Sequence, residues 1–194
     1  MTLSEKTQSI QRYLGITADG IYGPQTADAI LAKLGIPVGP SKESLVPFQV
    51  DARSAQNIQT LLPEVQPLAE RLVTLAAEKG ITIKVISGNR TYEEQDALYA
   101  KGRTTGGQKV TNARGGQSNH NFGIAFDIGV FSPSGAYVEE GPAYREVGKL
   151  GKSLGLVWGG DWKTIVDEPH FEFNPNGYTL AELRSRKERG LTLV

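Results

Sequence analysis

A stretch rich in glycine and proline near the N-terminus divides this sequence into two unequal parts. Residues 35–41, Gly-Ile-Pro-Val-Gly-Pro-Ser, interrupt the preceding helical pattern and are typical of a linker. Before them, residues 5–34 have the pattern of two short helices around a turn, and so small a bundle buries little apolar surface. We therefore predict a helical segment over residues 1–38, a linker over residues 39–58 and a larger domain over residues 59–194.

The larger part switches repeatedly between the period of a helix and that of a strand. Helical patterns cover residues 67–79, 93–101, 143–154 and 179–188. Short runs rich in β-branched or aromatic residues predict strands at residues 81–86, 124–131, 156–158 and 170–173. Helices and strands in mixed order are typical of the α+β class, so we predict a small antiparallel sheet with flanking helices.

Composition excludes several classes of protein. Lys and Arg total 21, as do Asp and Glu, so the net charge is zero and no overall attraction to nucleic acid is expected. The absence of cysteine excludes disulfides and thiolate metal sites. No run approaches the roughly 18 apolar residues of a membrane span, and the N-terminus lacks the apolar core of a signal peptide. We expect a chain made in the cytosol, without membrane insertion, and nothing in the sequence demands more than a monomer.

The chain contains only two histidines, His120 and His170, and a carboxylate follows the first of them at Asp127. A catalytic zinc ion takes three nitrogen or oxygen ligands from protein and keeps a fourth position open, which this set satisfies. If residues 125–129 form a strand, Asp127 points away from the face that carries the core residues. The spacing favours a metal site, with purely structural histidines as the alternative.

Two motifs resemble the paired signature of the LAS zinc metallopeptidases. They are Ser118-x-His120-x-x-Gly123-x-Ala125-x-Asp127 and Asp167-x-x-His170. This family includes D-alanyl-D-alanine carboxypeptidases and dipeptidases of bacterial walls and the L-alanyl-D-glutamate endopeptidases of phage endolysins. The resemblance implies that the cofactor is Zn²⁺ and that its ligands are His120, Asp127 and His170.

The resemblance also implies catalytic residues. The family carries its general base three residues before the second histidine, which is Asp167 here. Glu168 is the rival. Pro169 interrupts regular strand geometry just before His170, so the alternation of side chains cannot decide which of the two carboxylates faces the site. Arg90 is implied to hold the developing oxyanion or a substrate carboxylate, and the alternative is an ordinary surface salt bridge.

Several further residues have two interpretations each. Ser118 is predicted to hydrogen-bond substrate, with shaping of the ligand loop as the alternative. Trp158 is predicted to line the substrate site, with core packing as the alternative. Glu172 either orients the imidazole of His170 or is a plain surface carboxylate. The polar, glycine-rich residues 102–117 form a predicted loop that either folds over a bound peptide or only connects two elements.

The N-terminal segment carries a resemblance of its own. The run from Ile10 to Gly15, followed by Asp19-Gly20-Ile21-Tyr22-Gly23-Pro24-Gln25-Thr26, resembles the peptidoglycan-binding domain of bacterial and phage wall hydrolases. A plain helical arm is the alternative to a wall-binding segment.

Taken together, the motifs predict a zinc endopeptidase that hydrolyses the stem peptide of peptidoglycan at the L-alanyl-D-glutamate bond. A D-alanyl-D-alanine carboxypeptidase with the same zinc site is one alternative. A wall-binding protein with structural zinc and no catalysis is another. The lack of a signal peptide and of cysteine fits an endolysin that is stored in the cytosol and released to the cell wall.

Overall fold

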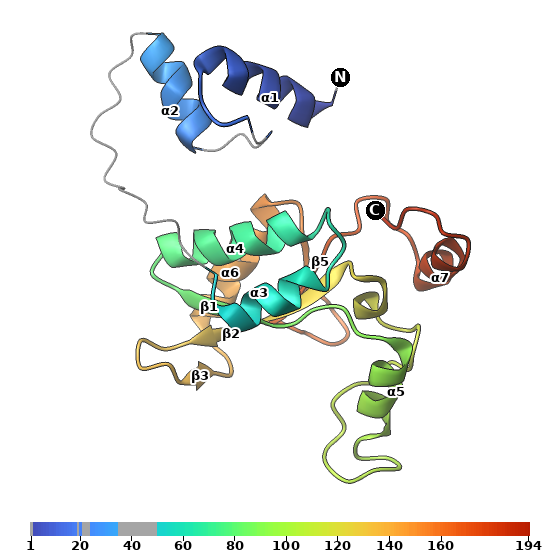
Figure 1. Cartoon of the computed structure of the whole chain (residues 1–194). Coiled ribbons are helices and arrows are strands. Elements are labelled where there is room, and N and C mark those ends of the chain that lie inside the picture. Colours follow the sequence, from blue (N-terminus) through green and yellow to red (C-terminus); the bar gives the residue numbers. More distant parts are fainter. Residues whose placement is uncertain (1, 19, 21–23, 35–49) are drawn as a thin grey trace. The chain divides into compact units, whose positions relative to one another are not determined.

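The chain is described from a computed structural model that covers residues 2–18, 20, 24–34 and 50–194 (Figure 1). It divides into two compact units, Met1–Pro47 and Phe48–Val194. The predicted interruption at residues 35–41 lies outside the described residues, as do positions 19 and 21–23 of the predicted turn. Each unit is described by itself below.

The N-terminal unit contains helix α1 (Leu3–Leu14) and helix α2 (Pro24–Lys33). A reciprocal capping box starts α1, because Thr2 accepts from the backbone of Glu5 and Glu5 accepts from the backbone of Thr2. Gly15 ends this helix in the left-handed conformation at φ 73°, which glycine adopts without steric cost.

A buried glutamine joins the two helices of this unit. Gln11 donates from Nε2 to Thr26 Oγ1 at 3.0 Å and accepts from the backbone N–H of Gly20 at 2.9 Å. Its side chain therefore connects α1 to both the turn and α2. These are positions of the N-terminal run that resembles a peptidoglycan-binding domain.

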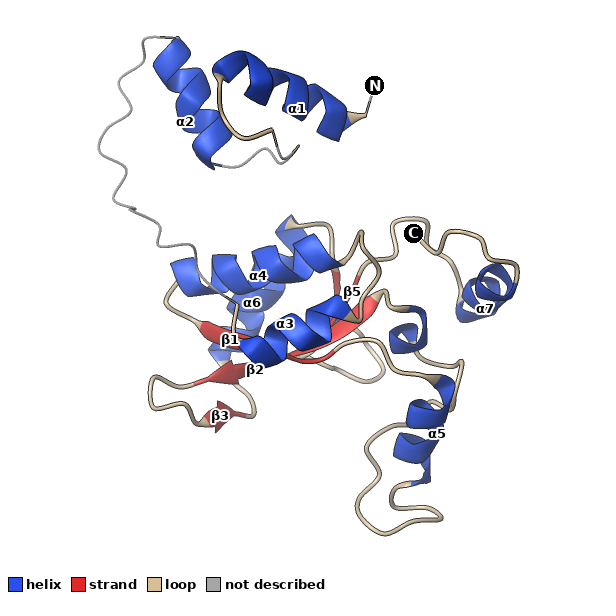
Figure 2. Ribbon diagram, in the orientation of Figure 1, coloured by secondary structure: helices blue, strands red, loops and turns tan. Residues whose placement is uncertain are grey.

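The second unit confirms the predicted α+β class (Figure 2). Its strands are β1 (Thr82–Ser87), β2 (Ala125–Phe131), β3 (Tyr137–Val138), β4 (Val157–Trp158) and β5 (His170–Glu172). Its α-helices are α3 (Ala52–Gln59), α4 (Gln66–Glu78), α5 (Tyr92–Ala100), α6 (Pro142–Ser153) and α7 (Leu180–Glu188), with short 3₁₀ turns η1 (Asn119–Phe122) and η2 (Gly159–Asp161). The sheet is antiparallel in the order β1-β2-β5-β4, and β3 pairs with β2.

One face of the sheet makes the main core. Ile83 and Val85 of β1, and Phe126 and Ile128 of β2, pack with buried residues of α3, α4 and α6. Because side chains alternate across a strand, the residues between these positions face the other side of the sheet. Asp127 is one of them, so the core fixes the strand that presents it.

Helix α6 approaches the sheet closely because two of its buried residues are glycines. A methyl group on Gly148 would overlap the ring of Trp158, and one on Gly151 would overlap the ring of Phe171. The two aromatic rings thus occupy the space that side chains of α6 would otherwise fill. This contact holds β4 and β5 against the helical layer.

Helix α3 corrects the predicted boundary of the larger domain. Residues 50–58 were assigned to the linker, but α3 occupies most of them and begins at the cap Asp51, which accepts from the backbone of Ser54. Ser54 also accepts from the backbone N–H of Val85, and Ile58 is buried in the core. The helix escaped prediction because Ile58 is its one large apolar residue, too few for a recognisable helical period.

Among the described residues, no helix combines the length and apolar character needed to cross a bilayer.

Candidate metal centre

The pairing of β2 with β5 brings two of the predicted ligands together. In the antiparallel register Asp127 lies directly opposite His170, and Phe126 lies opposite Phe171. Phe126 and Phe171 are buried in the core, so Asp127 and His170 share the opposite face of the sheet. Two residues 43 positions apart in sequence thereby become neighbours.

The third predicted ligand, His120, comes from the short turn η1. The carbonyl of His120 accepts from the backbone N–H of Arg90 at 3.0 Å, which ties the turn to the segment after β1. Gly123 then reverses the chain at φ 69°, and its carbonyl accepts from the backbone N–H of Leu62 at 2.9 Å. The chain can enter β2 immediately after this reversal, which sets His120 beside Asp127.

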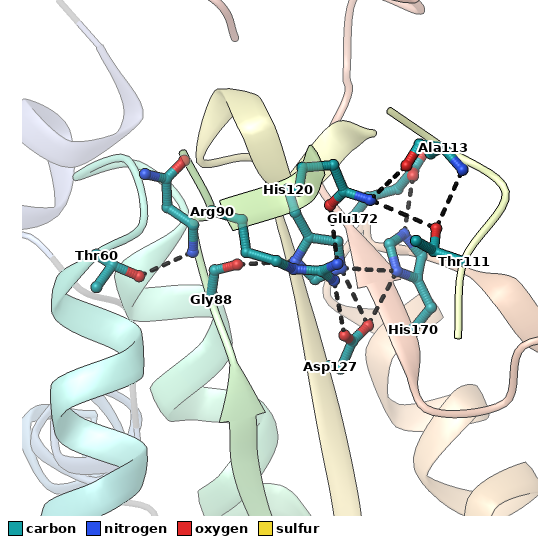
Figure 3. A network of polar contacts seen from close by, with 11 residues as sticks. Thr60, Gly88, Arg90, Thr111, Ala113, His120, Asp127, His170 and Glu172 are labelled. Atoms are coloured by element: carbon teal, nitrogen blue, oxygen red, sulfur yellow. Dashed lines mark hydrogen bonds and ion pairs between the residues drawn. The ribbon is translucent and has the colours of Figure 1, made fainter. Parts of the chain in front are cut away.

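Three donor atoms converge at this point (Figure 3). His120 Nε2 and His170 Nδ1 each lie 3.1 Å from Asp127 Oδ1, and the two nitrogens are 3.3 Å apart. Donors that share a tetrahedral zinc ion at about 2.1 Å are separated by about 3.4 Å. The donor types and their spacing therefore fit a catalytic zinc site.

Each imidazole is held through its outer nitrogen. His120 Nδ1 lies 2.8 Å from the carbonyl oxygen of Gly88, and His170 Nε2 lies 3.1 Å from Glu172 Oε2. Asn119 donates to the same carboxylate oxygen of Glu172. These contacts favour a proton on the outer nitrogen of each ring, so the inward nitrogen is the one placed to bind a metal. Glu172 is only 8% exposed and is not the surface carboxylate of the alternative interpretation.

The charges in this cluster stabilise one another. Burial alone would raise the pKa of Asp127, but the charges and hydrogen bonds of His120 and His170 hold it well below its usual value. Burial alone would lower the pKa of His170, yet its bonds to Asp127 and Glu172 raise it to about 9. The carboxylate is thus ionised over the whole physiological range, as a metal ligand requires.

Arg90 lies beside the ligands. Its Nη2 donates to Asp127 Oδ2 at 3.2 Å (Figure 3). Its Nη1 donates to Gln95 Oε1 at 3.0 Å. The buried Nε has no hydrogen-bond partner in the described part of the chain. Burial lowers the pKa of Arg90, and the nearby carboxylates of Asp127 and Asp167 oppose that change. The surface salt bridge of the alternative interpretation is therefore not what the structure contains.

Gln95 is a site residue that the sequence did not reveal. It is fully buried, accepts from Arg90, and donates from Nε2 to the carbonyl of Ala113 at 2.9 Å. The same Nε2 lies 3.4 Å from Thr111 Oγ1. The buried residue of α5 is polar, so the spacing of apolar residues in the sequence does not reveal Gln95. Its one signal was a position on the first turns of a helix that closely follows Arg90.

A cavity of about 1180 Å³ opens over the three donors. Its lining includes the predicted residues Arg90, Ser118 and Asp167 together with His120, Asp127 and His170. Burial raises the pKa of Asp167, and the negative charge of Asp127 raises it further, against the opposing effect of His170, His120 and Arg90. A carboxylate that binds protons more readily than usual therefore lies in the same cavity as the ligands.

The rival carboxylate lies elsewhere. Glu168 lines a second cavity of about 640 Å³, and its Oε1 lies 3.8 Å from Arg145 Nη1. It is absent from the lining of the cavity over the three donors, whereas Asp167 borders both cavities.

The sequence of this chain is similar to those of known proteins. A family model described as D-alanyl-D-alanine carboxypeptidase matches residues 111–173, which include all three donors. Over 125 residues the chain is 42% identical to the peptidoglycan L-alanyl-D-glutamate endopeptidase CwlK of Bacillus subtilis, spanning 60% of this chain and 75% of that protein. This chain belongs to the LAS-type zinc metallopeptidases.

Two further proteins resemble this LAS-type peptidase. This chain is 32% identical over 131 residues to the L-alanyl-D-glutamate peptidase of Listeria phage A118. The match covers 66% of this chain and 43% of the phage protein. The crystal structure of the Serratia marcescens L-Ala D-Glu endopeptidase ChiX aligns with a TM-score of 0.46 and 26% identity, over 63% of this chain and 86% of that one.

The two tryptophans of the peptidase lie in different surroundings. Trp158 was predicted to contact substrate, but it is 7% exposed, packs in the core against Gly148, and donates from Nε1 to the carbonyl of Glu168 at 2.7 Å. Trp162 lines the cavity instead, with its ring centroid 4.9 Å from that of His170. The reason is that β4 presents Trp158 to the helical layer, whereas Trp162 follows η2 outside the sheet.

The glycine-rich loop over residues 102–117 forms part of the cavity wall. Lys109, Val110, Thr111, Asn112, Ala113 and Gln117 contribute to the lining. Arg103 holds the loop in shape, donating from Nη1 to the carbonyls of Tyr99 at 2.7 Å and Thr111 at 2.9 Å. The loop therefore does more than connect two elements, because it forms part of the cavity wall.

Proposed function

We propose that this peptidase is a zinc-dependent endopeptidase that hydrolyses the L-alanyl-D-glutamate bond in the stem peptide of peptidoglycan. The observation that carries the proposal is the convergence of His120, Asp127 and His170 in one cavity with a carboxylate and a guanidinium at their side. The names of the Bacillus and Listeria phage relatives support the choice of bond.

We assign Asp167 as general base and then general acid. Zinc held by the three ligands would polarise the carbonyl of the scissile amide and lower the pKa of a water molecule. Asp167 accepts the proton of the attacking water and later returns it to the leaving amine. Its raised pKa suits both steps, because a weakly acidic carboxyl accepts a proton readily and remains able to give it up.

We assign Arg90 to the developing oxyanion. Its guanidinium lines the cavity and is held on both sides, by Asp127 and by Gln95, so it needs no reordering when negative charge develops nearby. Ser118 and Trp162 line the same cavity, and we propose that they contact the bound peptide.

The proposal also covers the oligomeric state and the role of the N-terminal unit. Every residue assigned to the site belongs to one chain, so a monomer suffices. We further propose that the unit formed by α1 and α2 binds peptidoglycan, which would hold the peptidase on its polymeric substrate.

Mass spectrometry of purified peptidoglycan after digestion tests the function. We expect new D-glutamate amino termini, abolished by a chelator and restored by zinc. Release of free D-alanine alone would instead identify a D-alanyl-D-alanine carboxypeptidase. No product from a zinc-loaded protein on competent substrate would leave a wall-binding protein whose zinc is structural.

A further inference from the structure

Two lysines on the cavity wall have no ionic partner among the residues that the structure describes. Lys109 comes from the loop over residues 102–117 and Lys163 from the segment that follows η2, and both line the cavity over the metal centre. Both are exposed, and within the described part of the chain neither makes an ion pair. They bring two positive charges from separate segments to the same cavity.

In the described part of the chain, Arg90 is the other cation that lines the cavity, and it is paired with Asp127. Four cations outside the lining contact backbone carbonyls or aromatic rings: Arg103 with Thr111, Arg114 with Tyr99, Arg184 with Gly116 and Lys187 with Asn121. A ligand that carries negative charge would therefore meet Lys109 and Lys163 as the available cations.

The charges that line the cavity also favour an anion. Its two carboxylates are Asp127, which Arg90 and the histidines neutralise, and Asp167, which we assign to proton transfer. The lysines leave a surplus of positive charge beyond the metal centre. This positive charge attracts a substrate carboxylate, whereas it changes the binding of an uncharged group little.

The substrate supplies such a carboxylate at a fixed place. Glutamate has two carboxyl groups, and a peptide chain that continues beyond it uses one of them. The other remains free on the residue whose amino group leaves when the L-alanyl-D-glutamate bond is cut. This carboxylate thus lies on the residue that contributes the nitrogen of the scissile amide.

We propose that Lys109 and Lys163 recognise the free carboxylate of the D-glutamate residue and make the peptidase selective for the acid over its amide. This inference rests on the proposed function, since it concerns the residue next to the bond that we expect to be cut. A lysine ammonium on a flexible stem suits this task, because it is a point charge without the fixed fork of arginine.

Two synthetic stem peptides test the proposal, one with the free carboxylate at D-glutamate and one with a carboxamide there. Each partly exposed ion pair should change kcat/KM about threefold, so the zinc-loaded enzyme should prefer the acid by about tenfold. Lys109→Met and Lys163→Met should each reduce the acid-to-amide ratio of kcat/KM about threefold, and the double variant should bring it near one.

Lys101→Met is the matched control, because Lys101 is an exposed lysine next to the same loop that does not line the cavity. It should keep the ratio of the unaltered enzyme. Equal cleavage of both peptides by the unaltered enzyme would overturn the inference and leave the proposed function intact. Cleavage of neither peptide would overturn the proposed function itself.

Discussion

His170 is held between two carboxylates. This placement orients its imidazole ring before a metal ion binds. Asp127 contacts one ring nitrogen and Glu172 contacts the other, each at 3.1 Å. Asn119 in turn donates to Glu172. Such outer contacts fix both the tautomer and the direction of the ring, so a residue that never touches the metal contributes to its affinity.

Glu172→Ala should therefore weaken zinc binding about 10- to 100-fold, as measured by competition with a chromogenic chelator. Glu172→Gln should recover part of the affinity, because an amide oxygen can still accept from His170 Nε2. The control is Glu168→Ala, which removes a nearby carboxylate that lines the second cavity. Unchanged affinity in Glu172→Ala would show that the imidazole needs no such support.

Asp167→Asn should reduce kcat/KM at least about 100-fold, because the amide cannot accept the proton of the attacking water. Zinc content measured by atomic absorption should stay at one ion per chain, since Asp167 is not among the three converging donors. Glu168→Gln should retain most activity. If instead Glu168→Gln were inactive and Asp167→Asn active, the general base would have been assigned to the wrong carboxylate.

Asp167→Asn should also stabilise the folded protein when no metal is bound. Because the pKa of Asp167 is raised in the folded state, its ionised form disfavours folding. Asp167→Asn should thus raise the Tm of chelator-treated protein at pH 7. The gain should shrink as the pH falls through the raised pKa toward the ordinary value of 3.8, where the carboxyl becomes protonated in both states. Scanning fluorimetry between pH 4 and 8 measures this, and a gain independent of pH would contradict it.

At the scale of elements, the loop over residues 102–117 is connected to the metal centre through side chains. Gln95 of α5 contacts both Arg90 and the carbonyl of Ala113, while Arg103 holds the carbonyl of Thr111. The position of the cavity wall and that of the guanidinium are therefore coupled through one buried amide. A change in the loop should be detected at the site without any change in its ligands.

Arg103→Met should release this loop. It removes two hydrogen bonds from a charged donor to backbone carbonyls, and we expect kcat/KM to fall on the order of tenfold with zinc affinity unchanged. Hydrogen exchange should accelerate over residues 104–113. Arg189→Met, at the exposed end of α7, serves as the control. A loop that stays protected in Arg103→Met would show that Gln95 alone holds it.

Periodicity predicted the elements that bury an apolar face, such as β2 and α4, because that face leaves a regular pattern in sequence. It missed α3, which is mostly polar, and Gln95, which is buried for its hydrogen bonds. The three residues proposed as ligands were found by residue type and motif, but the pairing of Asp127 with His170 depends on non-local strand register. The direction of the Trp158 side chain could not be predicted, because a two-residue strand gives no alternation to read.

At the scale of the whole molecule, the two units contribute unequally to the core and to the candidate site. All residues of the main core and all residues assigned to the site lie in the unit Phe48–Val194. The unit Met1–Pro47 contributes neither ligands nor cavity lining among its described residues. Catalysis on a small substrate should therefore be independent of it.

A chain that begins at Phe48 should keep kcat/KM on a soluble stem peptide within about twofold and unfold at a similar Tm, because its core is complete. Its binding to purified sacculi, measured by co-sedimentation, should weaken on the order of tenfold, because the second attachment site is gone. Undiminished sedimentation would show that the N-terminal unit does not bind the wall. A loss of peptide cleavage would show that the two units depend on each other.

The register between β2 and β5 has a consequence for changes in chain length. An insertion of a single residue within either strand would turn Asp127 or His170 toward the opposite face of the sheet. The turn that follows β2 is under no such constraint, because residues 133–136 are exposed and none of them lines the cavity. That turn is where the peptidase can accept a grafted epitope or a fused domain while its ligands stay in place.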